Sequence, residues 1–159
     1  MTAGAVATAG EEIAFPSVPW FQRLADLMNA NRARQEQLGY VDCVAGFTVT
    51  DGAPGGAPWT ALVTFEEFAA TTVREAGPGE TGDFTIAASL ATWRAMIESV
   101  ARGRGRPELD QTLNRLSHFG TPIAVTSDDP LKRDLYFRYN QSLQEFVNAS
   151  AAFCTTFAR

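Results

Sequence analysis

The stretch that most constrains the fold is Gly82–Val100, GDFTIAASLATWRAMIESV, where a strand pattern becomes a helical pattern with no loop between them. Phe84, Ile86 and Ala88 share one side of a two-residue period, as in a strand with one apolar face. Apolar residues then recur at three- and four-residue intervals, at Leu90, Trp93, Met96, Ile97 and Val100. Ser89 stands where a hydroxyl can cap a helix. The pattern predicts a strand that leads directly into a helix with Trp93 on its buried face.

The rest of the chain supplies further strands and helices around this stretch. A helix capped by Ser17 is expected to end at Gly39, and a strand with Phe47 on its apolar face should follow. Other expected elements are strands at residues 59–65, 68–75 and 122–125 and a short helix marked by Leu109, Leu113 and Leu116. From Pro130, apolar residues share one helical face as far as Phe157, which predicts one long amphipathic helix that could break near Asn148.

Length and charge limit the class of protein. The chain has 159 residues, 45% of them hydrophobic, which suits one soluble domain, and no apolar run approaches the roughly 20 residues of a membrane span. We expect residues 1–14 to be a disordered leader and residues 15–159 to be the domain. The net charge of -5 and the single lysine argue against nucleic-acid binding. Arg102, Arg104 and Arg106 form the only basic cluster, which is read either as a solvated loop or as a contact for an anion or an acidic partner.

Residues with reactive side chains are sparse. No catalytic or phosphate-binding motif occurs, and we expect neither a metal nor a cofactor. Cys43 and Cys154 both lie in apolar-periodic segments and are read as buried structural thiols, or else as a disulfide or a reactive thiol. His118 is read as a structural histidine or as a general acid or base. Tyr136 and Tyr139 are read as core residues or as hydroxyls that face a ligand cavity.

Several segments resemble the sterol-binding domain family of sterol carrier protein 2 (SCP2). They are WFQRLADLMNANRARQEQLGY, VDCVAGFTVTDG, FEEF, FTIAASLATWRAMIESV and FGTPIAV, which together cover roughly Phe15 to Val147. The strand before the Trp93 helix and Gly120 before the last strand match features of that family. RGRGRP replaces the family's usual connection after this helix, and the C-terminal helix is longer than a minimal domain needs.

The resemblance implies a single-domain α+β fold in which helices pack on one side of a five-stranded, mainly antiparallel sheet and enclose an apolar tunnel. The implied function is binding of a sterol, fatty acyl or polyketide-like molecule, as a carrier or presenter. The alternative is a cyclase or isomerase of bacterial specialised metabolism that uses His118, Tyr136 or Tyr139. The expected tunnel lining is Phe47, Ile86, Trp93, Ile97, Leu113, Leu116, Phe119, Leu135, Tyr139, Leu143 and Phe146.

The same resemblance sets expectations about location and partners. The terminal FAR differs from a peroxisomal SKL signal, so a bacterial cytoplasmic protein is expected. The partner should be a hydrophobic small molecule, with no nucleic acid and no stable membrane insertion. The long C-terminal helix is expected to act as a lid, or to pair with its copy in a homodimer.

Overall fold

A computed structural model describes residues 11–157 of the chain. Its main sheet has five strands in the order β4 (Ala69–Glu75), β3 (Trp59–Glu67), β2 (Val41–Val49), β5 (Phe84–Ala88) and β6 (Ala124–Thr126). A second, two-stranded sheet pairs β1 (Glu12–Phe15) with β7 (Cys154–Phe157) in parallel. Residues 12–14, which were expected to belong to a disordered leader, form part of β1; residues 1–10 of that expected leader lie outside the described residues.

The main sheet is mixed. Strands β2 and β3 are antiparallel, as are β3 and β4, and β5 and β6. Strand β5 instead runs parallel to β2, because the chain passes from the outer strand β4 to the opposite side of β2 before it re-enters the sheet. The expected mainly antiparallel α+β sheet is thus confirmed, with one parallel pair at its centre.

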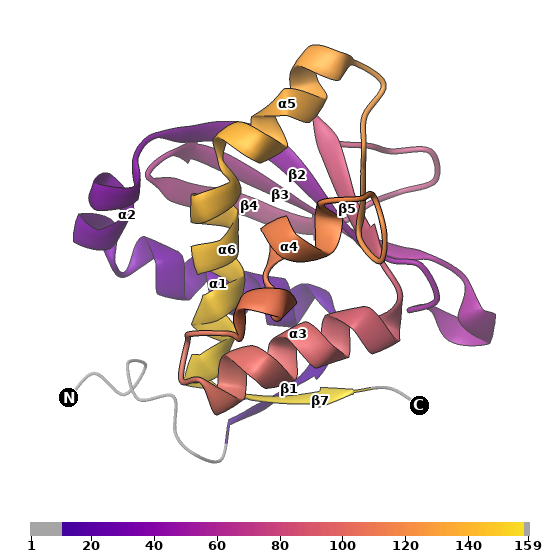
Figure 1. Ribbon diagram of the computed structural model, residues 1–159, viewed down its shortest axis with the longest axis horizontal. Helices are drawn as coiled ribbons and strands as arrows, with labels where there is room; N and C mark the ends of the chain where they lie inside the picture. Colours follow the sequence, from indigo (N-terminus) through magenta and orange to yellow (C-terminus); the bar gives the residue numbers. More distant parts are fainter. Residues whose placement is uncertain (1–10, 158–159) are drawn as a thin grey trace.

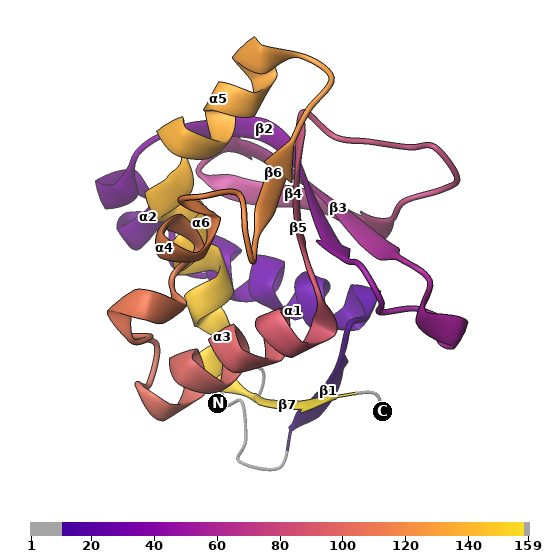
Figure 2. The ribbon, with the colours of Figure 1, turned by 45° about the vertical axis from the view of Figure 1, so that its right-hand side comes forward.

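Between residues 11 and 157, six helices accompany the sheet and lie mainly over one of its faces (Figures 1 and 2). They are α1 (Val18–Asn29), α2 (Arg32–Leu38), α3 (Leu90–Arg102), α4 (Leu113–Ser117), α5 (Pro130–Arg138) and α6 (Asn140–Asn148). Short 3-10 turns occupy Pro54–Gly56, Leu109–Gln111 and Ala149–Ala152. On the covered face of β2, side chains alternate with the strand period and are buried at Val41, Cys43, Ala45, Phe47 and Val49.

The junction between β5 and α3 forms as predicted. The Ser89 Oγ accepts a hydrogen bond from the backbone N–H of Thr92 at 3.2 Å, which caps the helix. Asp51 adds a second acceptor, 2.7 Å from the backbone nitrogen of Leu90. Trp93 is fully buried, and its Nε1 donates to the carbonyl oxygen of Thr48 on β2 at 2.9 Å. This bond ties α3 to the central strand.

Two predicted helices are each divided. Asn31 separates α1 from α2, and its side chain accepts a hydrogen bond from Arg34 N at 3.4 Å as the cap of the second helix. The expected long C-terminal helix bends at Tyr139, whose backbone leaves helical geometry between α5 and α6. Helix α6 ends at Asn148, where a break was expected, and a 3-10 turn then leads into β7 in place of further helix. A shared apolar face cannot show the breaks at Asn31 and Tyr139, since neither proline nor glycine marks them.

Candidate functional site

The predicted tunnel lining is mostly the packed core of the protein. Buried members are Phe47, Ile86, Trp93, Ile97, Leu113, Leu143 and Phe146, whereas Leu116, Leu135 and Tyr139 are half-buried. Phe119 is 87% exposed, in the turn after α4. Leu116, three residues earlier in α4, packs its side chain against the core.

Aromatic rings fill the centre of this core. The ring of Phe47 lies 5.8 Å from Phe146 and 5.1 Å from Phe21, measured between centroids, and Trp93 lies 5.9 Å from Phe15. Neither Phe47 nor Trp93 lines any of the surface pockets described below. The inner side of α3 therefore contacts packed side chains.

The residues predicted for an enzyme lie in separate surroundings. Tyr136 is buried, its hydroxyl is 2.9 Å from Ser117 Oγ, and burial raises the pKa of its phenol despite the hydrogen bond with Ser117. Tyr139 lines a small pocket with Tyr40 and Arg138 that contains neither Tyr136 nor His118. The His118 side chain is exposed and its ring contacts Phe119.

An apolar groove lies between the outer side of α3 and β7, which run beside each other in Figures 1 and 2. We call it the β7 groove; its volume is about 440 Å³. From α3 it is lined by Arg94, Ile97, Glu98 and Ala101, and from the C-terminal segment by Ser150 and residues 153–157. Ile97 is the one predicted lining residue among them.

Polar groups occupy defined places along this groove. Ser150 is 2% exposed, and within residues 11–157 its Oγ has no hydrogen-bond partner. The Arg94 guanidinium lies 4.9 Å from the centre of the Phe157 ring and also pairs with Glu98 at 3.1 Å. Cys154 is exposed, contrary to the prediction of a buried thiol, because residues 154–157 alternate as a strand. The groove thus combines an apolar lining with a buried hydroxyl that lacks a partner.

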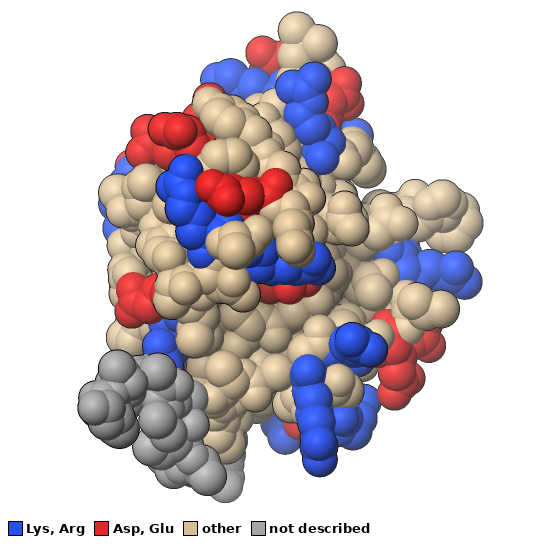
Figure 3. All heavy atoms as spheres, turned by 90° about the vertical axis from the view of Figure 1, so that its left-hand side faces the viewer, with Lys and Arg blue, Asp and Glu red and all other residues tan. Residues whose placement is uncertain are grey.

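A larger and more polar cleft lies where α2, α6 and the loop after α3 meet. We call it the arginine cleft; its volume is about 870 Å³, and Arg34, Arg104 and Arg106 line it together with Glu145. Leu27, Met28 and Phe146 supply apolar surface. Figure 3 views the side of the molecule that carries α2 and shows basic and acidic side chains interspersed with uncharged surface.

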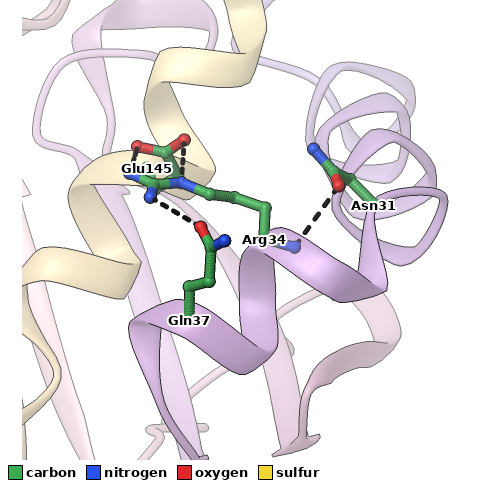
Figure 4. A network of polar contacts seen from close by, with 4 residues as sticks. All are labelled: Asn31, Arg34, Gln37 and Glu145. Carbon is green, nitrogen blue, oxygen red and sulfur yellow. Dashed lines mark hydrogen bonds and ion pairs between the residues drawn. The ribbon is translucent and has the colours of Figure 1, made fainter.

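One ion pair joins two walls of this cleft. Arg34 on α2 reaches Glu145 on α6, with Nε 3.2 Å from Oε2 and Nη2 3.5 Å from Oε1 (Figure 4). Gln37 accepts a further bond from Arg34 Nη1 at 3.4 Å. The geometry is that of a two-pronged arginine–carboxylate contact, which fixes the guanidinium plane. Sequence spacing could not reveal this pair, because its residues are 111 positions apart.

Comparisons with known proteins find structural neighbours but no sequence match. No family model and no curated protein sequence matches the chain significantly. Among solved structures, sterol carrier protein 2 superimposes with a TM-score of 0.63 at 17% identity, over 85% of this chain and 95% of that one. A conserved hypothetical protein from Thermus thermophilus superimposes with a TM-score of 0.60 at 15% identity, over 93% and 94% of the two chains.

These likenesses establish the fold. The chain has the SCP2-like fold, as its sequence resemblance predicted. Within the described residues, no helix is long and apolar enough to span a bilayer, and no group of three or more His, Cys, Asp or Glu side chains is arranged to hold a metal ion.

Proposed function

We propose that the protein binds a hydrophobic small molecule in the β7 groove. The observation that carries the proposal is the groove itself: apolar side chains from α3 and the C-terminal segment surround about 440 Å³, within the usual range of ligand pockets. The SCP2-like fold supports the same class of ligand, because sterol carrier protein 2 shares the architecture.

The lining suggests what such a ligand would carry. Ile97 and Phe153 are buried core residues at the base of the groove, and Phe157 adds a half-buried ring. Apolar groups of the ligand would gain stability by covering these surfaces. A single hydroxyl or carbonyl on the ligand would find a partner in the Ser150 hydroxyl. Sterols, fatty acyl chains and polyketides all combine these two properties.

The proposed role is that of a carrier or presenter. His118, Tyr136 and Tyr139 do not line the groove, so it contains none of the side chains predicted for a cyclase or isomerase. A homodimer remains a prediction, and the long helix on which it rested is replaced by α5, α6 and β7. Cytoplasmic location and a role in bacterial specialised metabolism also remain predictions.

Filling the groove tests the proposal. Ala101→Trp would place a large ring in the groove from α3, whereas Ala95→Trp changes another exposed alanine of the same helix that does not line it. Native mass spectrometry with a panel of fatty acids, sterols and polyketides should find a ligand retained by the wild type and by Ala95→Trp, and lost from Ala101→Trp. A wild-type protein that stays empty across the panel, or equal losses in both variants, would contradict the proposal.

A further inference from the structure

The arginine cleft is built differently from the β7 groove. Three arginines and one glutamate line it, in a chain whose net charge is -5. Arg34 is paired with Glu145, but within residues 11–157 Arg104 and Arg106 have no carboxylate partner. Two free guanidinium groups therefore face a concave surface, where walls of low dielectric strengthen their field.

The loop that carries these two arginines is held in one conformation. The backbone N–H of Gly105 donates to the Val100 carbonyl at 2.9 Å, and that of Glu108 donates to Ser99 Oγ at 2.9 Å. At Gly103 a Cβ atom would lie 1.8 Å from the carbonyl oxygen of Arg106, so only glycine fits. Arg104 has a φ of 54°, in the left-handed region that non-glycine residues seldom adopt. Such backbone persists where the surrounding structure holds it in place.

Uncharged surface continues the cleft beyond the arginines. Leu27, Met28 and Phe146 lie along it, and Met28 and Phe146 are buried members of the core. Gln35 also lines it, is 6% exposed, and its side-chain amide forms no hydrogen bond with the described residues. An occupant that meets all these groups has an anionic end, a group that can bond to an amide, and an apolar part.

We propose that the arginine cleft is a second binding site, for an organic phosphate with an apolar tail. Arg104 and Arg106 hold the phosphate, and the tail lies on Leu27, Met28 and Phe146. Phosphate suits this arrangement because guanidinium groups bind its oxygens with paired, charge-assisted hydrogen bonds, and two of them balance its double charge. The Arg34–Glu145 pair joins α2 to α6, which form two walls of the cleft.

Dodecyl phosphate and dodecyl maltoside, both below their micelle concentrations, provide matched anionic and neutral probes for calorimetric titration. We expect dodecyl phosphate to bind the wild type, and Arg104→Gln/Arg106→Gln to weaken it at least about tenfold. Arg102→Gln is the control, because Arg102 ends α3 directly before this loop, pairs with Glu108 and does not line the cleft. Equal weakening by the control, unchanged affinity in the double variant, or equally tight binding of the maltoside would overturn the inference.

Two further experiments separate the contribution of the phosphate from that of the apolar tail, and binding in the arginine cleft from binding in the β7 groove. Inorganic phosphate should displace dodecyl phosphate only at much higher concentration, and equal affinity would refute the role of the apolar surface. Ala101→Trp, which fills the β7 groove, should leave dodecyl phosphate binding intact. If Ala101→Trp abolishes that binding while the double arginine variant retains it, the probe occupies the groove. That result overturns the second site and supports the first.

Discussion

The two sides of helix α3 differ in what they contact. On the inner side, Trp93 is fully buried among Phe15 and Phe47 and its indole N–H is bonded to Thr48. On the outer side, Arg94 and Ala101 face the β7 groove. The inner side stabilises the fold through filled volume, and the outer side offers space that a ligand could occupy. Helical periodicity alone identifies the buried face but not whether its partner is side chains or a ligand.

The two cysteines show the same contrast between the core and the groove. Cys43 lies on the core face of β2, 4% exposed, and burial together with Asp83 and Asp42 raises the pKa of its thiol to about 12. Cys154 lies exposed on β7 and lines the groove. The thiols therefore report separately on the core and on the groove.

The largest expected difference is in how fast the thiols of Cys43 and Cys154 are alkylated. At pH 8, about one Cys43 thiol in ten thousand would be ionised even if reagent reached it, so only Cys154 should react with iodoacetamide in the native protein. Peptide mass spectrometry would identify the labelled thiol, with Cys154→Ser as the control that should stay unlabelled until it is unfolded. A ligand in the groove should slow labelling of Cys154. Rapid native labelling of Cys43 would mean that the core opens far more readily than this packing implies.

Trp93→Ala should test whether the inner side is filled. We expect a loss of about 3–5 kcal/mol in the free energy of unfolding, because a large cavity replaces a ring packed among other rings. Trp93→Phe keeps most of that volume and should cost about 1–3 kcal/mol, since it leaves the Thr48 carbonyl without its donor. Urea unfolding followed by circular dichroism measures both. Near-normal stability of Trp93→Ala together with loss of a bound ligand would instead indicate an open tunnel at Trp93.

The raised pKa of Cys43 predicts a pH dependence of stability. Above pH 8.5 or so an unfolded thiol loses its proton, whereas the folded thiol keeps it up to about 12. The folded state then binds more protons, so the free energy of unfolding should fall by about 1.4 kcal/mol per pH unit from this group. Unfolding at pH 9.5 and 10.5 should show a shallower fall in Cys43→Ala than in Cys154→Ala. Identical slopes in the two variants would remove Cys43 as the cause.

The sequence predicted the elements whose signals are local. The turn from β5 into α3 follows from a change of period and the Ser89 cap, and β2 and β3 form where the alternating apolar pattern predicts strands. Prediction failed where distant residues decide the structure. Residues 154–157 become a strand because β1 pairs with them, across more than 130 residues. Neither the β7 groove nor the ion pair between Arg34 and Glu145 has a local signal.

Two buried serines, Ser99 on α3 and Ser150 in the 3-10 turn after α6, give the smallest predicted change in stability. Ser99 is 1% exposed and its Oγ accepts from Glu108 N at 2.9 Å, whereas within residues 11–157 the Oγ of Ser150 has no partner. Ser99→Ala should lower the free energy of unfolding by about 1–2 kcal/mol, because the Glu108 N–H loses its acceptor. Ser150→Ala should raise it by up to about 1 kcal/mol, because a buried hydroxyl without a partner costs desolvation energy. Thermal unfolding of the ligand-free protein compares the two. A destabilising Ser150→Ala would show that the hydroxyl has a partner inside the protein and would remove it as the group that waits for a ligand.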